Sequence, residues 1–434
     1  MTSFPARIVP TSTVLSAVAI LASYSQAQTC DLEHDFVTTS GPSSSVPTAG
    51  ARIDGVDDPA AAFAELGGHR YFRATTLGAG AELWRTDGTA AGTTLVADLE
   101  PGPAGSEPSE LTVVGGELFF VATTAAHGSE LWKSDGTAAG TVLVHDLVAG
   151  PGGSDPGNLI ALGGKLCFGA TTAAAGREPW VTDGTAAGSG LLAQTGFGNL
   201  DGGFLRPTLG AGGGYVLFHV LAGPGASPAL WRTDGTPAGT FALASMAPGA
   251  GTSDLSSGFH LGGDTLLALP TIAHGTELWR TDGTVAGTSL AHEFAAGAAD
   301  GMEPLGPRAA AVHGGLLHLA ARDGAGELRL FATDGTSAGT SQVIGSGHAP
   351  ADLVAAAGDL FYTASLPATG RELWRLAGGS AAMVAEAFGG PIDGIPTGVG
   401  QLTPLGSGVA YVAFDPIGGM EYLARDTRAG QTSP

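Results

Sequence analysis

Two sets of acidic residues recur through this sequence and could carry chemistry. Carboxylates bind calcium when about six to eight oxygens converge on one ion, and paired carboxylates perform acid–base catalysis. The first set is the Asp of an Asp-Gly-Thr triplet, at Asp87, Asp135, Asp183, Asp234, Asp282 and Asp334. The second set is a Glu two residues before an aromatic anchor position, at Glu82, Glu130, Glu178, Glu277, Glu372 and Glu421.

The spacing of these acids favours structural roles over catalysis. Each Asp-Gly-Thr turn offers one carboxylate, and small residues such as Ala90 and Ala91 lie beside it, which falls short of a calcium coordination shell. An Asp before Gly is instead typical of a turn whose backbone amides the side chain caps. Six equivalent Glu residues cannot form one active site, so we expect them to accept hydrogen bonds at strand ends. Calcium remains the alternative for the turns, and no other cofactor is expected.

Other sources of chemistry are sparse. The sequence has no nucleophile elbow, phosphate loop, zinc-ligand pair or dinucleotide fingerprint. Its formal charge of −22, with Lys133 and Lys165 as the only lysines, excludes a nucleic acid as partner, because the phosphate backbone would be repelled. Cys30 and Cys167 are too few for a disulfide framework, and Cys167 is predicted to be a small buried hydrophobe.

The recurring acids lie within a repeated unit. Its aromatic anchors are Trp84, Trp132, Trp180, Trp231, Trp279, Phe331 and Trp374, and Leu423 takes this place in the last unit. About 40–50 residues is the size of a four-stranded propeller blade, and successive anchors lie 43 to 52 residues apart. Eight units result. The six tryptophans are predicted to form the core between blades, and the alternative is a row of exposed rings that stack on sugars.

One unit shows how the strands follow from the residues. Within residues 110–147, β-type runs at 111–114, 117–123, 130–134 and 141–147 are separated by Gly115-Gly116, a polar loop and the Asp135 turn. Gly-Gly between two apolar runs predicts a tight hairpin, since both positions need a positive φ. The sequence therefore predicts an all-β fold, a β-propeller of about eight four-stranded blades. Seven blades or an open β-solenoid are the alternatives.

The ends of the chain differ from the repeats. Residues 1–28, with an apolar run at 14–22 and the small-residue site Ser25-Gln26-Ala27, predict a secretory signal peptide. Residues 29–58 are expected to hold a closing strand, near 31–37, and a Ser/Pro/Gly linker, followed by the repeat domain at 59–434. The last unit has three strands, so a strand borrowed from 31–37 would close the ring. No transmembrane segment is expected after signal cleavage, which predicts a secreted or cell-surface protein.

The segment Glu82–Thr89, with its copies at 130–137 and 277–284, gives the pattern Glu-Leu-Trp-x-x-Asp-Gly-Thr. This pattern resembles the ELWxxDGT repeat family of secreted bacterial proteins, and the resemblance covers about residues 60–425. It implies an exported, propeller-like repeat protein. It brings no activity and no functional residues with it.

The loops that vary from unit to unit are the predicted binding face. In a propeller, the connections between the second and third strands, and from each fourth strand to the next blade, emerge at one end. We call this the loop end. The binding residues predicted there are Glu107, His127, Asp155, Arg177, Asp201, Asp254, His274, Asp300, Glu303 and Arg371.

The function predicted from these features is that of a secreted or cell-surface binding, adhesion or interaction scaffold. Its partner would be an extracellular glycan or protein, and the protein is expected to be a monomer. One alternative is a propeller enzyme acting on extracellular polysaccharide, which would need two carboxylates at a set distance. Another is a structural component of the envelope. Enzymatic activity is not favoured.

Overall fold

The computed structural model describes residues 63–195, 205–220, 228–247, 258–303, 305, 308–385, 402–405, 408–415 and 419–426. The chain divides into a first unit, Met1–Leu205 with Thr233–Thr240, and a second unit, Arg206–Arg232 with Phe241–Pro434. The predicted signal peptide and closing strand lie outside the described residues. No described helix is long and apolar enough to cross a membrane.

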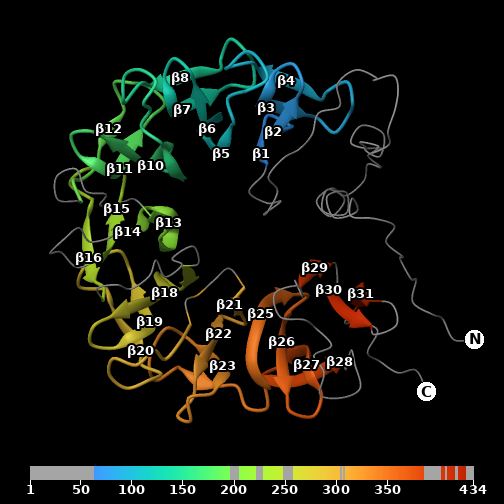
Figure 1. Cartoon of the computed structure of the whole chain (residues 1–434). Helices are drawn as coiled ribbons and strands as arrows, with labels where there is room; N and C mark the ends of the chain where they lie inside the picture. The colour runs from blue at the N-terminus through green and yellow to red at the C-terminus, as the bar shows by residue number, and fades with distance from the viewer. Residues whose placement is uncertain are drawn as a thin grey trace, which may run out of the picture. The chain divides into compact units, whose positions relative to one another are not determined.

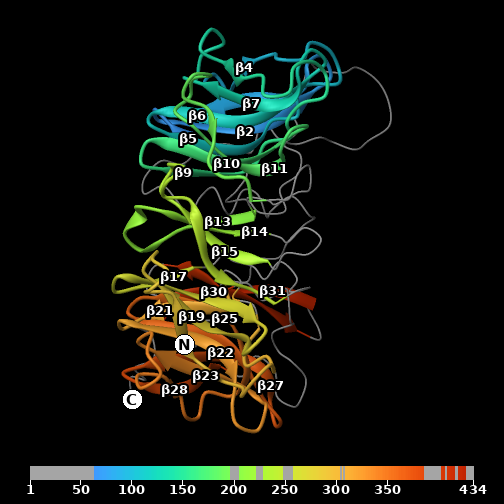
Figure 2. The same ribbon diagram turned by 90° about the vertical axis from the view of Figure 1, so that its left-hand side faces the viewer.

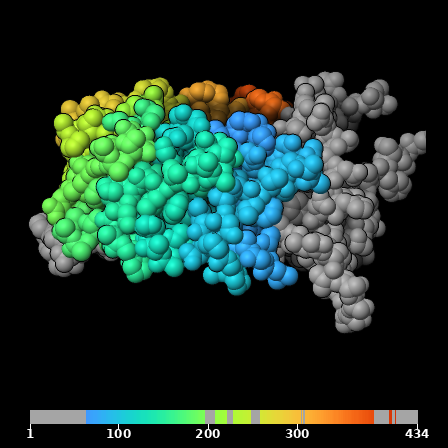
Figure 3. All heavy atoms as spheres, turned by 90° about the horizontal axis from the view of Figure 1, so that it is seen from above, coloured from blue at the N-terminus to red at the C-terminus, as the bar shows by residue number. Residues whose placement is uncertain are grey.

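Three four-stranded antiparallel sheets make up the described part of the first unit (Figure 1). Their strands are β1 (Ala64–Leu66), β2 (His69–Thr76), β3 (Gly80–Thr86) and β4 (Thr94–Ala97); β5 (Ser109–Val114), β6 (Glu117–Thr124), β7 (Gly128–Ser134) and β8 (Val142–His145); β9 (Gly157–Leu162), β10 (Lys165–Thr172), β11 (Gly176–Thr182) and β12 (Gly190–Leu191). Figure 2 shows these sheets stacked face to face, and Figure 3 shows their atoms as a continuous surface.

Four more sheets of the same kind and one three-stranded sheet follow. Their strands are β13 (Leu205–Leu209), β14 (Val216–Val220), β15 (Ala229–Thr233) and β16 (Phe241–Ser245); β17 (Phe259–Leu261), β18 (Asp264–Thr271), β19 (Gly275–Thr281) and β20 (Ser289–His292); β21 (Ala310–His313), β22 (Leu316–Arg322), β23 (Leu328–Thr333) and β24 (Ser341–Gln342); β25 (His348–Ala356), β26 (Asp359–Leu366), β27 (Gly370–Ala377) and β28 (Ser380–Ala385); β29 (Thr403–Leu405), β30 (Gly408–Asp415) and β31 (Gly419–Asp426). The described residues contain no α-helix, and η2 is a short 3₁₀ turn at Ala211–Gly213.

This architecture confirms the all-β, propeller-type prediction. Every sheet keeps its strands in sequence order, and the first strands of consecutive sheets lie in contact within a unit, as β1, β5 and β9 do. Such meanders are propeller blades. Within the described residues, seven sheets have four strands, where eight four-stranded blades are expected, and the last sheet has the predicted three strands. Ring closure remains a prediction, because the closing strand lies outside the described residues.

The register of each blade places the aromatic anchor opposite a large residue of the second strand. Trp84 pairs with Phe72, Trp132 with Phe120, and the third pair is Phe168 with Trp180. The turn before the second strand is the predicted Gly-Gly hairpin, for instance at φ +61° and +89° for Gly115 and Gly116. Glycine is needed there because other residues rarely adopt these angles.

The cores lie between consecutive blades and include the tryptophans. Trp132 packs on the cluster of Tyr71, Leu83 and Phe120, and Trp180 packs on that of Phe119, Leu166 and Phe168. In the second unit, Trp279 and Trp374 take the same role in two further clusters. These four anchors thus pack where the core prediction expects them. Trp84 and Trp231 are half-buried beside Phe72 and Phe218 of their own sheets, and for these two the core role remains a prediction.

Cys167 lies at the predicted position on β10. Its side chain is fully buried, and burial raises the pKa of the thiol to about 12. A thiol with that pKa stays protonated at neutral pH and is not a nucleophile. The prediction of a small buried hydrophobe is confirmed.

Candidate functional site

The Asp-Gly-Thr turns form a repeated hydrogen-bond network at the end of the blades opposite the loop end. Asp135 Oδ1 accepts hydrogen bonds from the backbone N of Thr137 at 2.9 Å and from its Oγ1 at 2.7 Å. The other five aspartates make the same backbone contact. The Thr137 hydroxyl and amide hold the pKa of Asp135 below its usual range. All six aspartates thus make the backbone contact that the turn-cap interpretation expects.

The second glycine of the motif is fixed by the same network. A Cβ at Gly140 would overlap the carboxylate of Asp135, while the backbone N of Gly140 donates to Thr137 Oγ1 at 3.0 Å. Ser134 and Thr141 close the loop through a 2.8 Å hydroxyl contact. Among the residues that the structure describes, no three His, Cys, Asp or Glu side chains gather as a metal site. Calcium at these turns is an untested alternative.

Asp135→Ala is expected to lower the free energy of unfolding by about 0.5–2 kcal/mol, the range for losing a side-chain cap on backbone donors. Chemical denaturation of the wild type and the variant, with and without a chelator, measures it. We expect the difference to be independent of calcium. A chelator that lowers the melting temperature of the wild type by several degrees would favour the metal instead.

The recurring glutamates fasten the chain that leads to the next blade. Glu82 Oε1 accepts from the backbone N of Ser106 at 2.9 Å and of Glu100 at 3.2 Å, and its Oε2 accepts from Ser106 Oγ at 2.5 Å. Glu130 accepts from the backbone N of Val148 at 3.1 Å and from Ser154 Oγ at 2.5 Å. These contacts tie the third strand of a blade to the connection that follows its fourth strand.

Two further glutamates make the same kind of contact, with Thr195 N donating to Glu178 at 2.7 Å and Phe294 N to Glu277 at 2.7 Å. We call Glu82, Glu130, Glu178 and Glu277 the glutamate clasps. All four are fully buried. Burial raises the pKa of Glu82, Glu130 and Glu277, and the hydrogen bonds partly offset it. The prediction that they accept hydrogen bonds at strand ends is confirmed.

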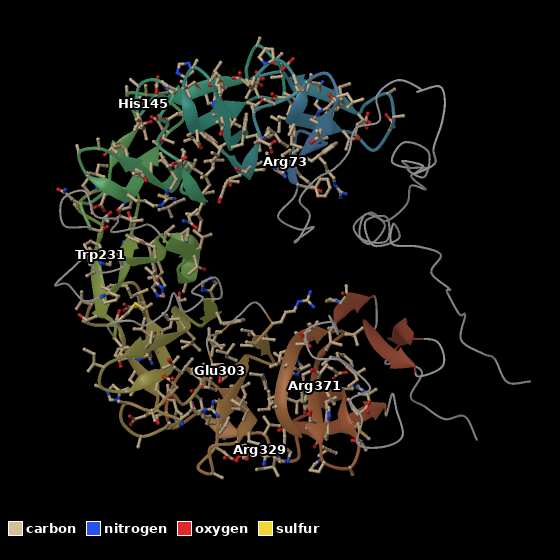
Figure 4. The ribbon with its side chains drawn as sticks, in the orientation of Figure 1. Arg73, His145, Trp231, Glu303, Arg329 and Arg371 are labelled. Carbon is tan, nitrogen blue, oxygen red and sulfur yellow. The ribbon has the colours of Figure 1, made fainter. Side chains whose placement is uncertain are left out.

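The predicted binding residues of the first unit line the connections that the clasps hold. Glu107 forms an ion pair at 2.8 Å with Arg73, which is labelled in Figure 4, and the side chain of Glu107 stays 56% exposed. Asp155 is exposed, and its backbone O accepts from Arg177 Nη1 at 2.7 Å. Glu107 and Asp155 have positive φ values of 52° and 46°, and each precedes a proline. Their amides donate to Ala81 and Ser129 of the third strands, which holds these loops in one conformation.

Histidines of two equivalent loops pair with acids of their own blade. His127 Nδ1 lies 2.9 Å from Asp146 Oδ2, and His274 Nδ1 lies 2.9 Å from Glu293 Oε1. The contact with His274 holds the pKa of Glu293 below its usual range. Each pair joins the loop after the second strand to the end of the fourth strand. The two histidines therefore brace separate blades.

The remaining predicted residues of the second unit divide into exposed and structural groups. Glu303 pairs with Arg322 at 3.1 Å and is 61% exposed. Asp300 Oδ1 accepts from the backbone N of Thr276 at 2.7 Å, which is a capping contact. Arg371 is buried and donates to Thr363 Oγ1 at 3.0 Å and to Ala349 O at 2.9 Å. Arg371, labelled in Figure 4, thus holds its strand in place inside the blade.

Within each unit, the described members of the predicted set make separate local contacts, and Asp155 and Arg177 are two members that contact each other. Asp201 and Asp254 lie outside the described residues. The exposed members are Glu107, Asp155, Asp300 and Glu303.

Two exposed apolar residues at the loop end are not among the binding residues that the sequence predicts. Leu77 and Ile272 each follow the last residue of the second strand, at equivalent positions in two blades, and are 88% and 66% exposed. Their sequence signal is a large aliphatic residue where other blades have Ala125 or Ala173. Single exposed aliphatic residues are common, but recurrence at one loop position marks a candidate contact surface.

Comparisons with known proteins give weak likenesses. No family model matches the chain, and no curated protein matches it. The puromycin hydrolase S511A mutant complexed with PGG is 18% identical, with a TM-score of 0.38 over 83% of this chain and 57% of that one. A Mycobacterium tuberculosis puromycin-hydrolyzing peptidase is 14% identical, with the same TM-score and the same coverage.

The β-propeller domain of the trilobed protease from Pyrococcus furiosus is 12% identical, with a TM-score of 0.32 over 74% of this chain and 95% of that one. This chain spans little more than half the length of the two puromycin-hydrolysing proteins. The activities in these names belong to those proteins. Membership of the ELWxxDGT repeat family remains a prediction.

Proposed function

We propose that this protein is a secreted or cell-surface binding protein whose propeller blades present ligand contacts at their loop ends, within each unit. The observation that carries the proposal is the exposure of Leu77 and Ile272 at equivalent loop positions. Exposed acids lie on the connections at the same end, at Glu107, Asp155 and Glu303. Exposed apolar and acidic groups on firmly held loops are the usual ingredients of a recognition surface.

The rest of the repeat supports this division between the two ends of the blades. The Asp-Gly-Thr carboxylates are engaged by their own turns, and the glutamate clasps are buried. Those groups serve the frame, so recognition is left to the loops that differ between blades. The clasps stiffen the loops, which lowers the entropy cost of binding.

The side chains of this surface indicate the ligand class. Exposed carboxylates accept hydrogen bonds from hydroxyl groups and attract cations, and aliphatic tips contact apolar patches. A polyhydroxylated glycan, or a protein segment with basic and apolar groups, can contact both the carboxylates and the aliphatic side chains. Binding of a cationic ligand would weaken as salt is raised, because screening acts on exposed charges.

A matched pair of variants tests the binding surface. The exported protein is screened on a glycan array and against extracellular proteins, and the strongest ligand is titrated. Leu77→Ser with Ile272→Ser is expected to weaken that binding by about tenfold or more, the loss for roughly 1.4 kcal/mol. Glu107→Gln with Glu303→Gln should weaken it further. All four side chains are exposed, so the melting temperature should not change.

Val285→Ser is the control, because Val285 is a 59% exposed aliphatic residue on an Asp-Gly-Thr turn at the opposite end. We expect it to bind as the wild type does. If Val285→Ser abolished binding while the loop-end variants kept full affinity, the binding surface would lie at the other end of the blades.

Catalysis on polysaccharide gains no comparable support. The glutamate clasps are fully buried, and backbone and hydroxyl donors occupy their oxygens, so they do not reach a substrate. Measuring turnover of the glycans that bind is the discriminating assay. If the wild type turned these glycans over and the loop-end double variants did not, the protein would be an enzyme, and the binding proposal would be wrong.

A further inference from the structure

A groove of about 570 Å³ lies between two blades of the second unit, β21–β24 and β25–β28. Its lining includes Leu316, His318 and Ala332 on one side, Leu376 and Gly379 on the other, and Gln342 on the outer strand β24. No Asp, Glu, Lys or Arg is among its lining residues. The groove belongs to the end of the blades that carries the Asp-Gly-Thr turns.

At other junctions the corresponding space is filled by a turn of the next blade. A Cβ on the turn glycine Gly184 would lie 3.1 Å from Phe119 Cζ, and one on Gly335 would lie 3.3 Å from Leu266 Cδ2. Both glycines have positive φ, near 89°. In each blade, one residue of the second strand pairs with the aromatic anchor. Phe119 and Leu266 each lie immediately before that residue. We call the place where this glycine lies the turn seat.

Basic residues also contribute to the turn seat. Arg85, next to Trp84, donates from Nη1 to the backbone O of Gly136 in the following blade at 2.8 Å. Arg232, next to Trp231, does the same to Gly283 at 3.0 Å. The seat therefore offers an apolar floor and a donor to the backbone of the turn.

Three changes leave the turn seat open between β22 and β27. Gly378-Gly379, a two-residue hairpin between β27 and β28, replaces the Asp-Gly-Thr loop. Ala332 stands where Arg85 does, next to the anchor. Leu319 pairs with the anchor Phe331, and His318 is the residue before Leu319. His318 therefore occupies the position that Phe119 and Leu266 occupy in their blades. The groove is thus the space that a turn fills elsewhere, with a histidine in its floor.

His318 gives this open seat a polar group. Its side chain is only 4% exposed, and its Nδ1 has no hydrogen-bond partner. Burial and the neighbouring ring of His313, 5.8 Å away between centroids, lower the pKa of His318 to about 4. The ring is therefore neutral at pH 7. A buried nitrogen without a partner costs free energy that a bound ligand can recover by hydrogen bonding to it.

We propose that this groove is a docking site for a turn of a partner polypeptide. The occupant is an uncharged loop whose glycine, at positive φ, lies over His318 as Gly184 lies over Phe119. One of its backbone amide groups hydrogen-bonds to His318 Nδ1. The shape argues for a turn, because a turn fills this space at the other junctions. The lack of Asp, Glu, Lys and Arg in the lining argues for a neutral one. The site is separate from the loop end and does not depend on the proposed function.

Imidazole NMR signals of the full-length protein test the proposal. The probe is a neutral head-to-tail cyclic peptide with the sequence of 134–141 in which Asn replaces the Asp, Ser-Asn-Gly-Thr-Ala-Ala-Gly-Thr. We expect a saturable shift of the His318 signals, which the His318→Phe spectrum assigns. The control peptide has Ala in place of both glycines, and its affinity should be at least tenfold lower.

Two variants should reduce peptide binding in a second assay, calorimetric titration. His318→Phe keeps an apolar floor but removes the nitrogen acceptor, so it should weaken binding at least tenfold. Insertion of Asp-Gly-Thr-Ala-Ala-Gly-Thr in place of Gly378-Gly379 fills the seat from within the chain and should abolish binding. His292→Phe is the matched control, since His292 contacts Ser337 away from the groove. It should bind as the wild type does.

Several results would overturn the docking site. These are the absence of a saturable shift, equal affinity for the alanine control peptide, or full binding by the variant with the inserted loop. An equal shift with N-acetylglycinamide would assign the groove to small amides instead. Concentration-dependent self-association that His318→Phe removes would make a second copy the occupant.

Discussion

Trp180→Ala is expected to lower the free energy of unfolding by about 3 kcal/mol, the lower end of the range for core aromatic side chains, because Trp180 is partly buried. Trp180 packs against the cluster of Phe119, Leu166 and Phe168 between two blades. Its removal leaves a cavity that the paired strands cannot close, because backbone hydrogen bonds fix the register of Trp180 opposite Phe168. Equilibrium unfolding in guanidinium chloride measures the loss.

Trp180→Phe is the control for this prediction. The indole Nε1 of Trp180 is buried and has no hydrogen-bond partner, so phenylalanine loses volume but no hydrogen bond. We expect Trp180→Phe to lower the free energy of unfolding by less than half as much as Trp180→Ala does. If Trp180→Ala left stability within about 1 kcal/mol of wild type and removed glycan binding, the tryptophans would be a sugar-stacking surface.

Glu130→Ala is expected to lower the free energy of unfolding by about 3 kcal/mol or more. It leaves the backbone N of Val148 and the hydroxyl of Ser154 without their acceptor, and each such buried donor costs about 1–3 kcal/mol. Glu130→Gln keeps the shape and one acceptor oxygen, so it should cost less. Urea denaturation of the three proteins compares them.

The pH dependence of the Glu130 variants has a definite sign. The folded pKa of Glu130 is raised, mainly by burial, so its favourable contribution is complete below the unfolded pKa of about 4.5 and is lost as pH rises through the folded value. The cost of Glu130→Gln should therefore be largest near pH 4 and shrink towards pH 8. A cost that grows with pH would mean that the ionised carboxylate is the stabilising form.

The repeat made most of the frame predictable from sequence. The Gly-Gly hairpins, the capping role of Asp135 and the acceptor role of Glu130 depend on residues that recur at fixed places in each unit, so one unit explains the others. The predicted strand ends agree less well with the structure. The fourth strand was expected at 141–147 and is observed at Val142–His145, and the first strand begins earlier than expected, at Ser109. Glu110, with φ +57° where the pairing with β6 shifts, explains the earlier start.

The loop residues were harder to predict, because their roles depend on which neighbour the fold supplies. Asp300 and Arg371 have the composition of binding residues, yet one caps a strand and the other is buried. Leu77 and Ile272 have the composition of core residues and are exposed. The groove at His318 arises from the meeting of two blades, each of which lacks a feature that the others have. No single repeat reveals it.

Hydrogen-exchange mass spectrometry of the protein with its strongest ligand tests the central claim most directly, namely that binding belongs to the loop end and the repeated turns belong to the frame. We predict protection of amides in 77–80, 98–107, 272–276 and 295–303, with unchanged exchange at the Asp-Gly-Thr turns 135–141 and 282–288. Protection confined to those turns, with the loop end unchanged, would contradict the account.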